Sequence, residues 1–235
     1  VPGISFDGIP ANSTFTYKFK LKQSGTYWYH SHSGFQEQTG MLGAIVIEPK
    51  GRERHPIDED HVIVLSDWTS RNPHNLLKLL KQRNDFDNYH LPDFKKLLAD
   101  IAETDLKTAF DKRKMWNQMR MLKTDMSDVT GYTFLINGKT PEQNWTGMFK
   151  PNEKIRLRFV NASAMSFYDV RIPNLKMTVV SADGQPVKPV AVDEFRIGTA
   201  ETYDVIVEPK GGHYQIEAES IDRAGYAIGT LHNEL

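Results

Sequence analysis

Apolar and polar residues alternate in short runs over most of the chain. Alternation with a period of two is typical of half-buried β-strands. The expected strands cover residues 14–22, 26–30, 44–48, 61–67, 132–136, 155–161, 168–172, 177–181, 194–197, 203–208 and 212–218. Turn dipeptides such as Asn137-Gly138 and Asp183-Gly184 lie between them. Short strands joined by tight turns predict an all-β fold, either an antiparallel sandwich or a barrel.

The middle of the chain, residues 74–126, lacks this alternation. Its apolar residues recur at the spacing of helices that each bury one face. They are Leu76, Leu77, Leu79 and Leu80, followed by Phe94, Leu97, Leu98 and Ile101. We therefore expect two or three helices inserted into a β domain. Pro92 suits the first turn of one helix, and Asp111 suits the cap of another.

A charged stretch without periodicity, residues 52–60, separates the first strands from the rest. Such a segment is typical of a linker between domains. It divides the chain into residues 1–51, a linker over 52–60, and a second domain over 61–235.

Composition excludes several classes of function. The chain has 235 residues and a formal net charge of −1, which gives no field to attract nucleic acid or an anionic membrane. No apolar run is long enough to span a bilayer. Cysteine is absent from the sequence, which excludes disulfides, thiolate zinc sites, Cys nucleophiles and a blue-copper centre within this chain. The opening Val1-Pro2-Gly3-Ile4 has no initiator Met and no signal-peptide pattern, as expected for a cleaved product or a piece of a longer chain.

Two histidines carry the strongest chemical signal. His30 and His32 are two positions apart at the end of an expected strand, so both imidazoles project from the same face. Neutral imidazole is a ligand for copper, zinc, iron and nickel. The pair alone is compatible either with a metal site or with two histidines on a solvated strand face.

The residues around this pair favour the metal site. Residues 25–32 (GTYWYHSH), 34–40 (GFQEQTG) and 42–47 (LGAIVI) together resemble the first-domain histidine motif of the multicopper oxidases. Within that family, residues 32–40, 113–119 and 128–138 are most similar to the bacterial periplasmic copper-resistance oxidases. The resemblance spans essentially the whole chain.

The resemblance implies a cupredoxin-like Greek-key sandwich, with a helical insertion over about residues 74–126. Residues 1–51 would be the C-terminal half of cupredoxin domain 1, and 61–235 would be domain 2, which generally binds no copper. His30 and His32 would each ligate one of the paired type 3 coppers, where dioxygen is reduced to water. The parent protein would be periplasmic and would oxidise a substrate, expected to be cuprous ion.

The chain also departs from the family pattern. The other cluster ligands come from an earlier HxH motif and from C-terminal motifs, and neither is present. The isolated chain is therefore expected to be inactive and to bind copper weakly. Its expected partners are copper ions and the rest of the same polypeptide, and its open sheet edges favour self-association.

Two rival interpretations remain. The first is a copper-free cupredoxin-like module for interaction or assembly, against which the retained His30 and His32 argue. The second is a copper nitrite reductase, whose corresponding segment has a Cys where Ser31 stands here.

Other residues are given structural roles. Met115, Met119, Met121 and Met126 cluster in the insertion. Thioethers suit cuprous ion, but we expect Met115 and Met119 to pack a helix against the sandwich. Asp67 and Asp183 are interpreted as turn formers. Surface or capping roles are expected for the remaining histidines, which are His55, His61, His74, His90, His213 and His232.

Overall fold

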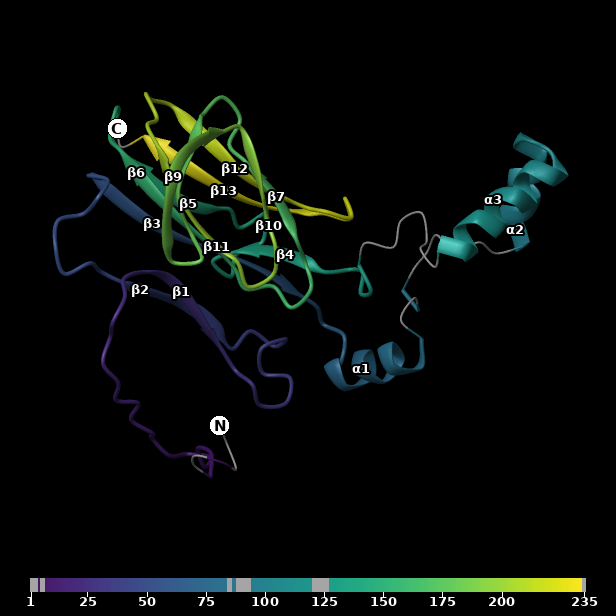
Figure 1. Ribbon diagram of the computed structural model, residues 1–235, viewed down its shortest axis with the longest axis horizontal. Coiled ribbons are helices and arrows are strands. Elements are labelled where there is room, and N and C mark those ends of the chain that lie inside the picture. Colours follow the sequence, from purple (N-terminus) through teal and green to yellow (C-terminus); the bar gives the residue numbers. More distant parts are fainter. Residues whose placement is uncertain (1–3, 5–6, 84–85, 88–93, 120–126, 234–235) are drawn as a thin grey trace.

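A computed structural model describes residue 4 and residues 7–83, 86–87, 94–119 and 127–233 of the chain (Figure 1). The strands are β1 (Gly25–His30), β2 (Leu42–Ile47), β3 (Glu59–Trp68), β4 (Thr133–Ile136), β5 (Trp145–Phe149), β6 (Ile155–Asn161), β7 (Tyr168–Arg171), β8 (Met177–Ala182), β9 (Gln185–Val192), β10 (Glu194–Ile197), β11 (Thr202–Val207), β12 (His213–Ser220) and β13 (Tyr226–Asn233). The helices are α1 (Pro73–Gln82), α2 (Phe94–Glu103) and α3 (Leu106–Met119).

Two mixed sheets form a sandwich. The six-stranded sheet has the order β4-β3-β6-β11-β8-β9, and the five-stranded sheet has the order β10-β7-β12-β13-β5. Most neighbours are antiparallel, whereas β3 pairs with β6, and β13 with β5, in parallel. This all-β sandwich with inserted helices confirms the expected fold class.

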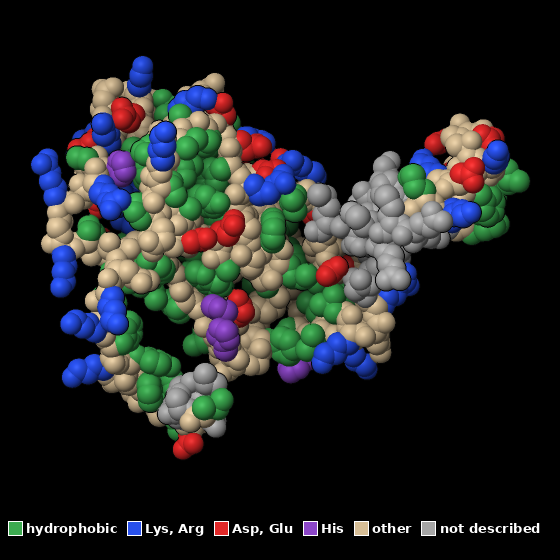
Figure 2. Space-filling model, viewed as in Figure 1, with side chains coloured by type: hydrophobic (Ala, Val, Ile, Leu, Met, Phe, Trp, Pro, Cys, Tyr) green, Lys and Arg blue, Asp and Glu red, His purple; other side chains and the backbone are tan. Residues whose placement is uncertain are grey.

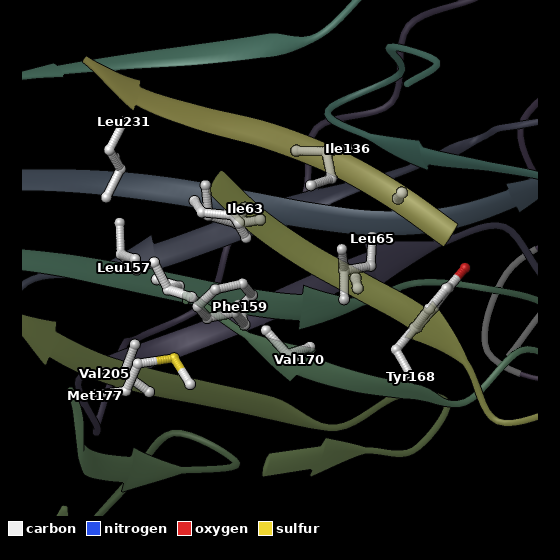
Figure 3. Packing of buried hydrophobic residues seen from close by; sticks show 14 of the residues in the cluster. Ile63, Leu65, Ile136, Leu157, Phe159, Tyr168, Val170, Met177, Val205 and Leu231 are labelled. Carbon is white, nitrogen blue, oxygen red and sulfur yellow. The ribbon is translucent and has the colours of Figure 1, made fainter. Parts of the chain in front are cut away.

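The core lies between the two sheets, as Figure 3 shows. Leu157 and Phe159 of β6 are fully buried and point toward the other sheet, while Leu231 of β13 is fully buried from the opposite side. The intervening β6 residues Arg156 and Arg158 therefore lie on the outer face of the six-stranded sheet. Both arginines are nonetheless buried, because the first fifty-odd residues cover them.

Strands β1 and β2 form a separate antiparallel hairpin that docks on this outer face. Thr26 is 1% exposed, and its Oγ1 donates to Oδ1 of Asp204 at 2.6 Å. The same Oγ1 accepts from Nη1 of Arg158 at 2.9 Å. Arg158 in turn donates two bonds to Asp60 through Nε and Nη2, at 2.8 and 2.7 Å. We call Thr26, Asp204 and Arg158 the docking triad.

Two glycines allow this close approach. Gly184 has a φ of +70°, which favours glycine, and a Cβ there would lie 2.4 Å from the ring of Tyr27. A Cβ on Gly25 would lie 2.6 Å from the carbonyl oxygen of Gly184. The hairpin therefore meets the β8–β9 turn backbone against backbone.

The alternating segment 14–22 is not a strand, contrary to the sequence prediction. Phe15, Tyr17, Phe19 and Leu21 are between 43% and 75% exposed. The segment finds no partner ladder among the described residues, and a strand pattern without a partner leaves the backbone without cross-strand hydrogen bonds. These four side chains therefore form an exposed apolar row on the segment that precedes β1.

The other expected strands are confirmed, and none of their ends differs by more than two residues from the prediction. Asn137 and Gly138 have φ of 49° and 74°, as a two-residue hairpin turn requires. Strand β3 begins at Glu59, so the charged segment ends earlier than expected. Three strands were not predicted, namely β5, β9 and β13.

The insertion forms three helices, in agreement with the sequence. The side chain of Asn72 caps α1 by accepting from the backbone N–H of His74 at 2.9 Å. Asp105 caps α3 by accepting from the N–H of Thr108 at 2.9 Å. The prediction of a cap at Asp111 is wrong, because Asp111 lies inside α3 and a side chain there is past the free N–H groups.

Helices α2 and α3 project away from the sandwich (Figure 1), and we call them the helical arm. Met115 is 47% exposed on this arm, so the prediction that it packs α3 against the sandwich is wrong. The two helices pack on each other, and their larger apolar side chains Phe94, Leu98, Leu106 and Phe110 are each more than half exposed. Pro92, Met121 and Met126 lie outside the described residues, as does the side chain of Met119.

Candidate metal centre

Strand β1 presents aromatic rings in a row at its C-terminal end. Trp28, His30 and His32 are each two positions apart, so they share one face. The rings of Trp28 and His30 stack with centroids 4.3 Å apart and an interplanar angle of 14°. The rings of His30 and His32 have centroids 4.5 Å apart and are tilted by 41°. The two candidate ligands are thus brought together, as the sequence predicts.

A carboxylate lies against the first imidazole. Oε1 of Glu37 is 2.9 Å from Nδ1 of His30. Nδ1 is buried and makes no hydrogen bond of good geometry, so the two groups are in close contact without a hydrogen bond between them. A carboxylate at one ring nitrogen of a histidine orients the ring and leaves the other nitrogen for a metal. Nε2 of His30 is therefore the atom available to a cation.

The loop after β1 is folded so that Glu37 returns to this position. Oγ of Ser31 donates to Oε1 of Gln36 at 2.6 Å and accepts from the N–H of Ser33 at 3.1 Å. The N–H of Met41 then donates to the carbonyl of Gln36 at 2.8 Å. Figure 2 shows histidine side chains grouped beside an acidic side chain on the surface of this region.

Glu37 was not singled out from the sequence. It stands within the quoted 34–40 motif, but nothing in its spacing from His30 distinguishes it from the other polar residues of the loop. Only the turn made by Ser31 and Gln36 brings it to the ring.

The two histidines fit part of a copper site. Imidazole nitrogens are suitable copper ligands, and the pair is oriented and half-exposed. Over the described parts of the chain there is no group of three or more His, Cys, Asp or Glu residues that could hold a metal ion. The described residues therefore bring two imidazoles together without a third His, Cys, Asp or Glu beside them that could complete a metal site.

Two carboxylates that the sequence analysis treated as turn formers have structural roles. Asp67 lies at the end of β3, and its carboxylate accepts from the N–H groups of Ala164, Met165 and Ser166 at 2.8 to 3.1 Å. It thereby holds the loop after β6. Asp183 has a φ of 48° and accepts from the N–H of Thr202 at 3.0 Å.

The remaining described histidines occupy varied environments. The ring of His74 contacts Phe35 edge to face, with centroids 4.6 Å apart, which joins α1 to the loop after β1. Nε2 of His61 lies 3.1 Å from the carbonyl oxygen of Met148. His213 and His232, for which surface or capping roles are expected from the sequence, face each other across β12 and β13 with ring centroids 5.9 Å apart. His90 lies outside the described residues.

Among the helices that the structure describes, none has the length and apolar character needed to cross a membrane.

Comparison with known proteins identifies the family. Two family models described as multicopper oxidase match, one over residues 59–234 and one over residues 1–52. The chain is 57% identical to copper resistance protein A of Escherichia coli, over 98% of this chain and 38% of that protein. It is 52% identical to copper resistance protein A of Pseudomonas syringae pv. tomato, again over 98% of the chain and 38% of the relative.

Solved structures agree on the fold. The blue copper oxidase from Nitrosomonas europaea superposes with a TM-score of 0.62 at 23% identity, covering 97% of this chain and 64% of that one. A mutant laccase from B. aclada superposes with a TM-score of 0.61 at 25% identity, covering 93% and 36%. The sandwich is therefore cupredoxin-like. The chain spans 38% of the length of the copper-resistance relatives, and it belongs to the multicopper oxidase family.

Proposed function

We propose that this chain supplies two copper ligands, His30 and His32, to the type 3 pair of a trinuclear cluster in a longer copper-resistance oxidase. The observation that carries the proposal is the geometry at the end of β1. Two imidazoles lie 4.5 Å apart on one face, and Glu37 lies at Nδ1 of His30. The names of the copper-resistance relatives support copper as the metal.

When bound, paired copper supplies the one-electron redox chemistry by which dioxygen is reduced to water. The residues of this chain bind and orient. Stacking on Trp28 and the carboxylate of Glu37 hold the plane of His30, and the carboxylate beside Nδ1 leaves Nε2 for the metal. The docking triad fixes the N-terminal end of β1 on the six-stranded sheet, and this contact determines the positions of His30 and His32 at the other end of the strand.

In this proposal residues 1–51 are the C-terminal half of cupredoxin domain 1 and residues 61–235 are domain 2. The remaining ligands and the blue copper come from other parts of the same polypeptide. We further propose that the parent protein is periplasmic and oxidises cuprous ion, and that the isolated 235-residue chain has no oxidase activity.

The exposed row formed by Phe15, Tyr17, Phe19 and Leu21 supports one more element of the proposal. These side chains and the open edges of the hairpin suit contact with the rest of domain 1. Without that cover the isolated chain self-associates. Light scattering over a range of concentrations tests this, and a monomer at every concentration would contradict it.

The decisive test of the proposed function uses the coding region on both sides of this chain. An HxH motif upstream and a Cys-containing copper motif downstream are expected. In the longer protein, His30→Ala with His32→Ala is expected to abolish the absorption of the paired coppers and to leave the blue-copper band in place. Normal cluster spectra in that variant would refute the assignment of the two ligands.

A further inference from the structure

The second feature with ligand chemistry is a row of three side chains on the outer face of the five-stranded sheet. His213 of β12 pairs with His232 of β13, and His232 pairs with Met148 of β5. All three positions alternate with neighbours that face the core, among them the partly buried Tyr214 and the buried Leu231 and Phe149, so the three side chains project from the same face.

The backbone pairing brings the two imidazoles close. The N–H of Asn233 donates to the carbonyl of Gly212 at 3.0 Å. Hydrogen-bonded and non-hydrogen-bonded pairs alternate along an antiparallel ladder, so the next pair, His213 and His232, is a non-hydrogen-bonded one. Side chains approach each other most closely at such pairs, with Cα atoms about 4.5 Å apart.

The ring geometry suits a shared ion. The centroids of the two imidazoles are 5.9 Å apart and the ring planes are tilted by 34°. Two rings that share one ion through nitrogen bonds of about 2 Å have centroids roughly 5–6 Å apart. Apart from the contact with each other, neither ring has a hydrogen bond or an ion pair within the described parts of the chain. Their ring nitrogens are therefore not committed to a protein partner.

Met148 occupies the next position in the row and is 43% exposed. A thioether is a soft ligand that favours cuprous ion over zinc, whereas imidazole accepts both. His213 is exposed and His232 is half-buried, so an ion from solution can reach the row directly.

We propose that His213, His232 and Met148 form a surface site for cuprous ion, separate from the pair at His30 and His32. The hairpin with His30 docks on the outer face of the six-stranded sheet through Thr26 and Arg158, whereas this row lies on the outer face of the other sheet. The second domain thus binds copper itself. This goes beyond the proposed function and stands even if His30 and His32 ligate no metal.

The test is an anaerobic titration of the 235-residue chain with cuprous ion against a chromophoric competing chelator. A background carrying His30→Asn and His32→Asn isolates the new site and is expected to bind one cuprous ion. In that background His213→Asn or His232→Asn weakens the affinity at least tenfold. Met148→Leu weakens it severalfold, and a matched control, His55→Asn, leaves it unchanged.

Nuclear magnetic resonance provides a readout that does not depend on stoichiometry. Stepwise addition of cuprous ion, which is diamagnetic, is expected to shift the ring protons of His213 and His232 before those of His55 and His74. The proposal is overturned if the background chain binds no cuprous ion or if the His213 and His232 variants bind it as tightly. Unchanged affinity in Met148→Leu, or tighter binding of zinc than of cuprous ion, overturns the assignment of a cuprous site.

Discussion

Replacing Thr26 with Val tests how the hairpin is held on the six-stranded sheet. Valine has the same shape but lacks the hydroxyl that joins the docking triad. The substitution removes a donor 2.6 Å from Oδ1 of buried Asp204 and an acceptor 2.9 Å from Nη1 of buried Arg158. Each hydrogen bond to a charged group contributes about 1.5–3 kcal/mol. Because one oxygen serves both groups, we expect a loss of about 2–3 kcal/mol rather than the full sum.

The cost of Thr26→Val is expected to depend on pH. Burial raises the pKa of Asp204, while the hydrogen bond from Thr26 lowers it. Because the folded protein disfavours the charged carboxylate of Asp204, this group destabilises the fold at pH values above its raised pKa. The destabilisation disappears as pH falls through that pKa and the carboxylate takes up a proton. Without the hydroxyl the carboxylate form is destabilised further, so the substitution costs most near neutral pH. In acid, where Asp204 is protonated, the bond between the hydroxyl and Asp204 is a neutral one worth only about 0.5–1.5 kcal/mol, while the bond from Arg158 is still lost.

Amide hydrogen exchange measures this loss where it occurs. The free energy of opening is expected to fall at the amides of Gly25–His30 and to change little at those of β12 and β13. Thr26→Ser, which keeps the hydroxyl, is the control and should retain most of the protection. Equal losses in the hairpin and in β12, or a loss independent of pH, would refute the role given to the docking triad.

Three further predictions concern separate contacts. Glu37→Gln keeps the size of the side chain but removes the carboxylate beside Nδ1 of His30, and loss of such a partner of a ligating histidine weakens metal affinity by about 10–100-fold. Competitive copper titration of Glu37→Gln in a chain that also carries His213→Asn should show this loss. Unchanged copper affinity would contradict the role given to Glu37. Hydrogen bonding from Arg196 lowers the pKa of Asp169, so this carboxylate stabilises the fold above its unfolded pKa of about 3.9 and ceases to do so as pH falls through its folded pKa. Asp169→Asn should therefore lower the urea midpoint of unfolding near neutral pH and should match the parent chain in strong acid. A difference in urea midpoint that is the same at all pH values would argue against this role of Asp169. Gly184→Ala adds a Cβ 2.4 Å from a ring carbon of Tyr27 at a backbone φ of +70°. The free energy of unfolding should fall by at least about 1–2 kcal/mol, and the amides of the hairpin should exchange faster. Unaltered protection of these amides would mean that the β8–β9 turn moves aside without cost.

Sequence periodicity predicted the sandwich well because its strands alternate between core-facing apolar residues and polar residues on the outer face. β6 is an example, with Leu157 and Phe159 in the core and Arg156 and Arg158 on the face that the hairpin covers. The strands that were missed carry residues that weaken the pattern. Gly147 interrupts β5, Gly229 interrupts β13, and β9 contains two prolines on an edge of its sheet, where proline is tolerated.

The sequence predicted the parts of the candidate sites that come from neighbouring positions in one strand, but not those that come from pairing between strands. His30 and His32 share a face because of strand geometry, which two positions of sequence reveal. His213 and His232 are nineteen positions apart, and only the register of β12 and β13 makes them neighbours. The helix cap at Asp111 was predicted wrongly because Asp105 and Asp111 have the same side chain. Which of the two caps α3 depends on where the helix begins, and the sequence does not show that position.

Strand β1 is anchored at one end and carries the two histidines at the other. Thr26 is hydrogen-bonded to the six-stranded sheet, and His30 lies four residues further along, a length of about 13 Å at roughly 3.3 Å per residue. A tilt of about 5° at Thr26 would move the ring of His30 by about 1 Å, which exceeds the roughly 0.5 Å tolerance of a preorganised site. The position of the proposed ligands is thus set at the far end of the strand, and substitutions there are expected to weaken metal binding without contacting the two histidines.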